Sequence, residues 1–255
     1  MSDRHGAVKS EAVAWSARAI AKESQRCELH LWRAVEAQHV VATRALVDSQ
    51  AEQELLEELL DAAKPAVPAD CARLDYLLYT PFRYPPVGCG SRFRALSDPG
   101  VWYGAEEVRT ACAEAGYWRW RFVTDSRGLK RLDGVPHTVF QATARGAAVD
   151  LRRKPFVREA ARWSDPDDYA ACQAFARAAR QAAVKLIRYR SVRDPAQAGC
   201  AAVLDCRAFC GTGGVRRRQT WFLTVDSWRV SWRRAGGAPR KSEGYEFVFG
   251  PAHRA

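Results

Sequence analysis

The sequence predicts an α+β protein with a mixed β-sheet core and flanking helices, preceded by a helical N-terminal extension. Short segments in which apolar and polar residues alternate are interleaved with segments of helical periodicity. Hairpins with intervening helices favour this class over a doubly wound parallel sheet, which needs regular strand–helix alternation. With 47% apolar residues and nine tryptophans among 255 residues, the chain can bury a sizeable core.

Residues 1–64 have a helical pattern. Ser49-Gln50-Ala51-Glu52 is a capping box, because the Ser49 hydroxyl can accept from the Glu52 amide while Glu52 reaches back. An apolar stripe of four leucines follows, and Pro65 ends it. We therefore expect a helical extension over residues 1–70 and a main domain over 71–255.

The stretch from Pro81 to Phe122 organises the main domain. Its pattern predicts, in order, a strand at 91–94, a turn at 98–100, a strand at 101–103, a helix at 104–115 and a strand at 117–123. This order brings Arg92, Tyr103 and Glu114 to places where one pocket can collect them.

The rest of the chain continues the α+β pattern. The predicted elements are two strands within 138–151 joined at Arg145-Gly146, a helix at 169–183, and strands at 184–191, 201–206, 219–225 and 228–233. Alternation in the 184–191 strand places Ile187, Tyr189 and Ser191 on one side.

Composition narrows the function classes. No apolar run approaches the ~18–20 residues that span a bilayer, and residues 1–9 lack the apolar core of a signal peptide, so we expect a cytoplasmic protein without membrane contact. The eight cysteines form no CxxC pair, and no histidine lies near the closest two. We therefore expect neither a disulfide framework nor a metal site.

A net charge of +11 permits binding to nucleic acid, an acidic protein or a phosphate-rich small molecule. The densest basic cluster is Arg216-Arg217-Arg218, and no helix-turn-helix, zinc finger or RNA-binding motif accompanies it. We interpret this cluster as a solvated basic face and do not expect direct nucleic-acid binding.

The candidate chemistry centres on Glu114. Taken alone, Glu114 is more simply a solvated helix residue, but the expected proximity of Arg92 and Tyr103 favours a functional role. A fixed carboxylate can stabilise an oxocarbenium-like transition state as a glycosidic bond breaks. Arg92 supplies bidentate donors to a pyrophosphate, and Tyr103 can stack on a ring while its hydroxyl makes a hydrogen bond. The GxSxG elbow, the P-loop and the GxGxxG fingerprint are all absent.

Several segments resemble the RES domain, which is named for its arginine, glutamate and serine. The matching segments are Arg83-Tyr84, GSRFR at 90–94, GVWYGAEEVRTACAE at 100–114 and IRYRSVRDP at 187–195. The segment VATRALVDSQAEQELLEELLDAAKP resembles the helical lead-in of longer members.

This resemblance implies an ADP-ribosyltransferase-like fold and the consumption of NAD⁺, with water or inorganic phosphate as the co-substrate. It also implies the toxin of a toxin–antitoxin pair, neutralised by an Xre-type helix-turn-helix antitoxin that occludes the active site. Glu114, Arg92 and Ser191 are then the catalytic residues, and the substrate is held by Arg83, Tyr84, Arg92, Tyr103 and Ser191.

The chain departs from the family at one place, and two alternatives stay open. Gly90-Ser91-Arg92-Phe93-Arg94 stands where the common motif is GGRWN, so the choice of acceptor is less certain than the use of NAD⁺. One alternative is a toxin that transfers ADP-ribose to a protein. The other is a basic binding protein whose RES-like pocket does no chemistry.

Overall fold

The computed structural model describes residues 15–37, 47–85, 90–209, 214–236 and 243–250. The helices are α1 (Ala17–Glu23), α2 (Gln50–Ala62), α3 (Tyr76–Arg83), α4 (Val108–Asp125), α5 (Ala160–Trp163) and α6 (Ala170–Gln181), with 3₁₀ turns η2 (Ala69–Cys71), η3 (Phe156–Glu159) and η4 (Cys206–Ala208). The strands are β1 (Gln25–Glu36), β2 (Trp102–Ala105), β3 (Leu132–Asp150), β4 (Leu186–Arg190), β5 (Gly199–Val203), β6 (Val215–Val225), β7 (Arg229–Arg234) and β8 (Gly244–Val248).

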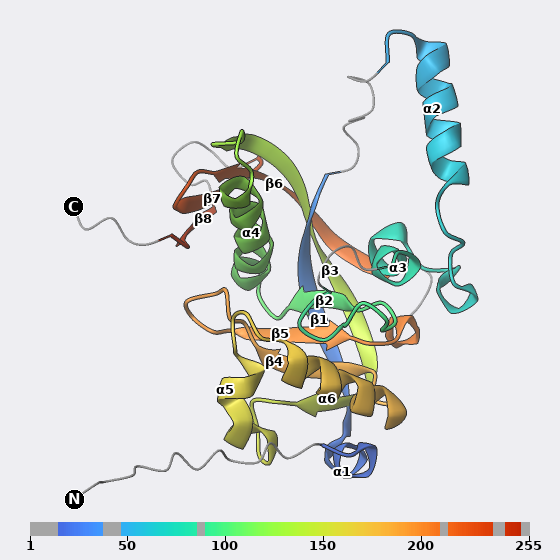
Figure 1. Cartoon of the computed structure of the whole chain (residues 1–255), viewed down its shortest axis with the longest axis vertical. Helices are drawn as coiled ribbons and strands as arrows, with labels where there is room; N and C mark the ends of the chain where they lie inside the picture. The colour runs from blue at the N-terminus through green and yellow to red at the C-terminus, as the bar shows by residue number, and fades with distance from the viewer. Residues whose placement is uncertain (1–14, 38–46, 86–89, 210–213, 237–242, 251–255) are drawn as a thin grey trace, which may run out of the picture.

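The strands form one mixed sheet in the order β1-β2-β5-β4-β3-β6-β7-β8, which confirms the predicted α+β class. Only the β3–β4 pairing is parallel among the described pairs. Because β1 also pairs with β3 along its whole length, the first five strands in this order close on themselves. Figure 1 shows the long β1 and β3 crossing the centre of the molecule, with α4 on one side and α2 standing apart from the sheet.

Two apolar clusters hold this arrangement. A smaller cluster combines residues of the closed strands, such as Leu31, Trp102, Phe140 and Val203, with residues of α3. Side chains of alternating strand positions fill the interior of a small closed sheet in this way. A larger cluster packs α4 and α6 against the sheet, so the inward faces of both helices are fixed.

Two predicted elements are wrong. Residues 25–36 form β1 and not a helix, since Leu29 and Leu31 alternate with exposed His30 and pair with β3. Residues 117–123 continue α4 and do not form a strand: Tyr117 and Val123 are buried while Trp118 and Phe122 are exposed. Trp118 and Phe122 are four positions apart, so they lie on the same outward face of the helix, although their alternation with arginines resembles a strand.

Other differences are smaller. Residues 91–94 form a tight turn closed by a Ser91–Arg94 bridge, and the two strands expected within 138–151 are one strand, β3. The Ser49 capping box at α2 is confirmed, as are α6 and strands β4 to β7 close to the predicted positions. The division into an extension over residues 1–70 and a domain over 71–255 stays a prediction, although β1 already belongs to the sheet. The segment 1–9 lies outside the described residues.

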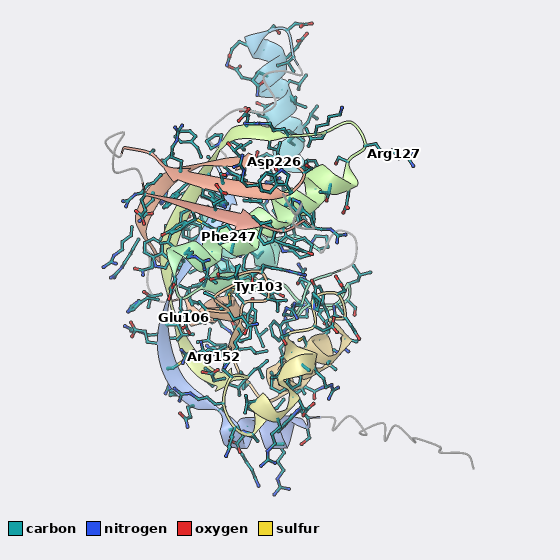
Figure 2. The ribbon with its side chains drawn as sticks, turned by 90° about the vertical axis from the view of Figure 1, so that its left-hand side faces the viewer. Tyr103, Glu106, Arg127, Arg152, Asp226 and Phe247 are labelled. Carbon is teal, nitrogen blue, oxygen red and sulfur yellow. A yellow bond between two sulfur atoms is a disulfide. The ribbon has the colours of Figure 1, made fainter. Side chains whose placement is uncertain are left out.

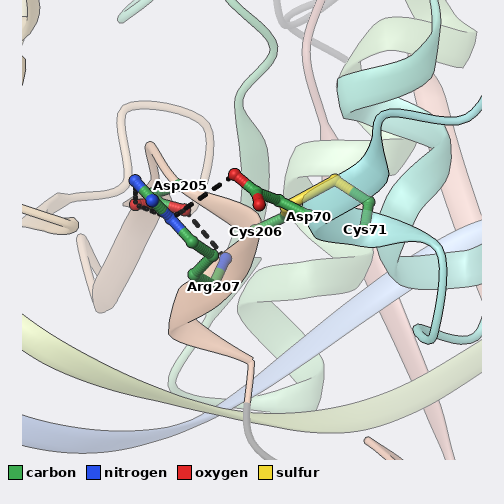
Figure 3. Close-up of a disulfide and its surroundings, with 5 residues drawn as sticks. All are labelled: Asp70, Cys71, Asp205, Cys206 and Arg207. Atoms are coloured by element: carbon green, nitrogen blue, oxygen red, sulfur yellow. Dashed lines mark hydrogen bonds and ion pairs between the residues drawn. A yellow bond between two sulfur atoms is a disulfide. The ribbon is translucent and has the colours of Figure 1, made fainter.

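The expectation of no disulfide is corrected at one pair. Cys71 in η2 and Cys206 in η4 form a disulfide with their Cα atoms 5.9 Å apart (Figure 3). The two cysteines are separated by 135 positions, so local spacing gives no sign of the bond. Beside it, Arg207 donates to Asp205 at 2.8 Å and approaches Asp70 at 3.8 Å.

Among the described helices, none is both long enough and apolar enough to cross a membrane.

Candidate active site

A cavity of about 470 Å³ opens where β1, β2, α4 and the Gly90–Arg92 turn meet. This volume lies within the roughly 300–1,000 Å³ of small-molecule sites. Strands β1 and β2 share one paired position, Trp32–Ala105. The next residues of both strands, Arg33 and Ala34 on β1 and Tyr103 and Gly104 on β2, line the cavity. The cavity therefore begins where the pairing of these two strands stops.

Glu114 lies on the inward face of α4 and lines the cavity. The helix can approach the sheet closely because residue 116 is glycine: a Cβ there would lie 2.7 Å from a methyl carbon of Val230. This close approach fixes the rotation of α4 and turns Glu114 towards β4 and β5. The Glu114 carboxylate is thus partly enclosed by the protein and does not lie on a solvated face of the helix.

Ser191 holds the Glu114 carboxyl. The Ser191 hydroxyl donates to Glu114 Oε1 at 2.5 Å. Its oxygen accepts from the backbone N–H groups of Arg193 at 3.2 Å and Asp194 at 2.9 Å. Since those two donors occupy the oxygen's lone pairs, the single hydroxyl proton is directed at Glu114. Ser191 is therefore an oriented donor that favours the ionised carboxylate.

Burial and hydrogen bonding oppose one another at Glu114. Burial raises the pKa of the carboxyl above its usual value, while the Ser191 hydroxyl, Arg92 and Arg193 lower it. The net effect is a raised pKa, so this carboxyl keeps its proton to a higher pH than an exposed glutamate. Such a perturbed group beside a cavity is a candidate for chemistry.

The turn that carries Ser191 is anchored to α4 by Asp194. The buried Asp194 carboxylate forms an ion pair with Arg109 and accepts from the Thr110 hydroxyl at 2.8 Å. Both partners lie in the first turn of α4. The helix that carries Glu114 and the turn that carries Ser191 are therefore held together at a second point.

Arg92 lines the cavity from the Ser91–Arg94 turn and is 9% exposed. Its Nη1 donates to the carbonyls of Trp163 at 3.0 Å and Asp165 at 2.8 Å. Its guanidinium also lies over the Tyr169 ring at 4.7 Å. The Cys172 side chain is a further partner. No carboxylate pairs with Arg92 among the described residues, so its positive charge remains available to an anion.

Tyr103 holds that same turn in place. Its hydroxyl accepts from the Phe93 N–H at 2.9 Å and shares a hydrogen bond of 2.8 Å with the Ser91 hydroxyl. Burial raises the pKa of Tyr103 to about 12. Figure 2 shows Tyr103 near the middle of the molecule, and Glu106, the residue that follows β2, close to Arg152, to which it is hydrogen-bonded at 3.3 Å. The Tyr103 hydroxyl is thus engaged with protein, while its ring lines the cavity.

Arg33 is a cavity residue that the sequence interpretation missed. It lies on β1, donates from Nη1 to the Tyr103 carbonyl at 3.1 Å and sits over the Trp102 ring at 5.2 Å. Burial lowers the pKa of Arg33 to about 10, so it stays charged at neutral pH. No ion pair involves Arg33 within the described ranges. The alternation of Leu29 and Leu31 was the signal that could have placed this residue on a strand.

Tyr169 and Arg193 complete the far side of the cavity. Arg193 Nη2 donates to the Tyr169 hydroxyl at 3.2 Å and to the Pro166 carbonyl at 2.5 Å. Its guanidinium lies 3.7 Å above the Tyr117 ring. Tyr169 therefore touches two arginines of the site, one through its ring and one through its hydroxyl.

Arg83 and Tyr84 are not brought to this cavity. Arg83 is the last residue of α3, and its Nε donates to the Pro65 carbonyl at 2.5 Å. Its guanidinium lies over Tyr84 at 5.6 Å, and the Tyr84 carbonyl accepts from Arg94 at 3.0 Å. Neither side chain is among the cavity's lining residues. Of the six predicted site residues, Arg92, Tyr103 and Glu114 line the cavity, and Ser191 reaches it through Glu114.

The described residues contain no group of three or more histidine, cysteine, aspartate or glutamate side chains that could hold a metal ion. The donor set of the cavity is instead one carboxyl group among three guanidinium groups and several aromatic rings. Such a set is suited to an organic molecule with anionic groups.

Comparison with known proteins gives three findings. The family model described as "RES domain" matches residues 67–232. The chain is similar to a chain in the crystal structure of the M. tuberculosis MbcT–MbcA toxin–antitoxin complex, with 14% sequence identity, a TM-score of 0.46, and coverage of 81% of this chain and 91% of that chain. Curated protein sequences show no match. Because the family model covers more than half of the sequence, the chain belongs to the RES domain family.

Proposed function

We propose that this protein cleaves the bond between nicotinamide and ribose in NAD⁺ and acts in the cytoplasm as the toxin of a toxin–antitoxin pair. The observation that supports this most is the Glu114 carboxyl, held by an oriented Ser191 hydroxyl in a cavity that also contains Arg33 and Arg92. NAD⁺ offers what these groups suit: a pyrophosphate for the guanidinium groups and a ribosyl carbon that becomes positive when its bond to nicotinamide breaks.

The charge of each side chain determines which part of NAD⁺ it contacts. Arg92 and Arg33 bind the pyrophosphate through donors that carry no carboxylate partner. Glu114 faces the ribose and stabilises the oxocarbenium-like transition state, which forms as nicotinamide departs with the electron pair of the C–N bond. Ser191 keeps Glu114 ionised and oriented. Tyr103 acts mainly through the turn that carries Arg92, since its hydroxyl is already engaged.

The acceptor is inorganic phosphate, water or a protein side chain, and product analysis distinguishes the three. Purified protein is incubated with NAD⁺ in the presence and absence of phosphate. ADP-ribose-1″-phosphate, free ADP-ribose or a labelled protein band identifies phosphorolysis, hydrolysis or protein modification, respectively. We expect phosphorolysis or hydrolysis.

Glu114→Gln is the decisive variant, because it keeps the shape of the side chain and removes its charge. We expect it to lower the rate of NAD⁺ loss by at least about 100-fold, in the range found when one stabilising group of a transition state is removed. Glu107→Gln, at the start of the same helix, is the matched control and should keep the wild-type rate. A Glu114→Gln protein that depletes NAD⁺ at the wild-type rate would refute the assignment.

The toxin role and its partner, an Xre-type helix-turn-helix antitoxin, follow from the family resemblance. Induced expression in a bacterial host should stop growth and deplete cellular NAD⁺, and Glu114→Gln should do neither. Coexpression with the product of a neighbouring helix-turn-helix gene should restore both. Growth arrest by the Glu114→Gln protein would point to toxicity by binding, which is the non-catalytic alternative.

A further inference from the structure

Trp118 is a residue of the cavity to which no role has yet been given. It lies four positions after Glu114 on α4, so both side chains are on one face of the helix and adjacent along it. It lines the cavity and is nevertheless 51% exposed. Covering a large apolar side chain at the open end of a cavity removes apolar surface from water and is favourable. A ligand bound in the cavity can provide this cover.

The indole of Trp118 is held on one side and open on the other. Tyr117 packs against it at 5.4 Å between ring centroids, with the rings inclined at 78°. In the described part of the chain the Trp118 N–H makes no hydrogen bond, whereas those of Trp102, Trp120 and Trp163 donate to backbone carbonyls. Those three tryptophans are thus engaged by the fold through their N–H groups, while Trp118 presents its ring at the cavity.

The charges of the cavity indicate which part of a ligand meets this ring. Arg33, Arg92 and Arg193 are its cations, and the only carboxyl group among its lining residues is Glu114. NAD⁺ is anionic at its pyrophosphate and cationic at its nicotinamide ring. The α4 wall carries a carboxylate and an electron-rich indole, two groups that attract a cation.

We propose that Trp118 binds the nicotinamide ring of NAD⁺ by stacking and cation–π attraction, and so selects the oxidised dinucleotide. This inference rests on the proposed function and adds the orientation of the substrate, with nicotinamide along α4 and the pyrophosphate at the arginines. Nicotinamide is bonded directly to the ribosyl carbon that Glu114 serves, which agrees with the position of Trp118 one helical turn away.

A specific kinetic signature follows. When the C–N bond breaks, the ring nitrogen takes up the bonding electron pair and the ring loses its positive charge. Trp118 therefore attracts the ground state at least as strongly as the transition state. Loss of such an interaction raises KM without lowering kcat, unlike the loss of a group that only oriented Glu114.

Trp118→Ala should raise KM for NAD⁺ about tenfold, with kcat within about twofold of wild type. Phe122→Ala is the matched control, because Phe122 is an equally exposed aromatic residue one turn further along α4 and does not line the cavity. It should change neither constant. Trp118→Phe keeps an aromatic face and should lie between wild type and Trp118→Ala.

Calorimetric titration provides the second readout, with nicotinamide mononucleotide and ADP-ribose as the two probes. Trp118→Ala should weaken binding of nicotinamide mononucleotide about tenfold and leave ADP-ribose binding unchanged, because ADP-ribose lacks the cationic ring. An unchanged KM and unchanged mononucleotide affinity would overturn the proposal, as would equal weakening of ADP-ribose, which would place adenine on Trp118. Failure of the proposed function is a separate result: wild-type protein would then leave NAD⁺ intact.

Discussion

Arg92 and Arg83 are the same residue type a short distance apart in the chain, each beside an aromatic residue, yet they are held in different ways. Arg92 lies in a turn fixed by Tyr103 and by two carbonyls beyond η3, and it faces the cavity. Arg83 closes α3 and donates to the Pro65 carbonyl away from the cavity. The role of an arginine in this protein is therefore set by the backbone that positions it and not by its neighbours in sequence.

The largest test of this comparison is substitution of the arginines themselves. Arg92→Ala and Arg33→Ala should each lower kcat/KM for NAD⁺ about 100-fold, because each removes charged donors from a partly buried anion site. Arg83→Ala should stay within about threefold of wild type, since it loses a hydrogen bond to a backbone carbonyl and a contact with the Tyr84 ring, both outside the cavity. Initial rates of NAD⁺ loss measure all three variants, with far-UV circular dichroism as the folding control.

The comparison breaks if Arg83→Ala loses as much activity as Arg92→Ala. That result would place the end of α3 in the catalytic site. Arg92→Lys sharpens the comparison further: it keeps the charge but not the planar fork, so it should recover only part of the loss.

The next effect concerns what holds Arg92. Tyr103→Phe leaves the Phe93 N–H without its partner, which costs about 1–3 kcal/mol of stability for a buried donor. We expect the midpoint of urea unfolding to fall and activity to drop about tenfold, as a loosened turn misplaces Arg92. Tyr84→Phe is the control, since no hydrogen bond of the Tyr84 hydroxyl is described. If Tyr103→Phe lowered activity without lowering stability, its hydroxyl would instead serve the substrate.

The smallest effect is a shift in pH dependence. In the proposed mechanism NAD⁺ cleavage needs the Glu114 carboxylate, so activity should be lost as pH falls through the raised pKa of this group. Ser191 donates to the carboxylate and lowers that pKa against the effect of burial. Ser191→Ala should therefore move the acid limb of the kcat/KM profile to higher pH. At high pH, where Glu114 is ionised in both proteins, the variant should lose less activity relative to wild type than it does at low pH. An acid limb at the same pH in both proteins would show that Ser191 does not act through Glu114.

Much of the fold could be predicted where local chemistry decides it. The capping box of α2 and the periodicity of α6 are local signals, and both helices are present. The C-terminal half of α4 could not be predicted in this way, because its aromatic residues face outward and their alternation imitates a strand. Strand β1 is defined by pairing with β3, which is more than 100 residues away in the chain.

The same limit applies to the site. The order of the predicted elements grouped Arg92, Tyr103 and Glu114, and the family resemblance added Ser191; the structure places the first three around one cavity and Ser191 behind Glu114. Arg33 was missed because its contact with Tyr103 crosses 70 positions and depends on β1 being a strand. The motif of Arg83 was visible in the sequence, but the direction of the end of α3 was not, so its position outside this cavity could not be foreseen; its role in substrate binding stays a prediction.

The single shared position between β1 and β2 gives the substrate a structural as well as a chemical part. Around the five closed strands this is the least paired contact, so local opening there breaks fewer hydrogen bonds than elsewhere. In the proposed mode of binding, the pyrophosphate of NAD⁺ would bridge that gap, between Arg33 on β1 and the Arg92 turn that Tyr103 of β2 holds in place. Because cleavage of the nicotinamide–ribose bond leaves the pyrophosphate in the ADP-ribosyl product, this bridge would outlast the reaction, and the strands would separate freely only when that product leaves.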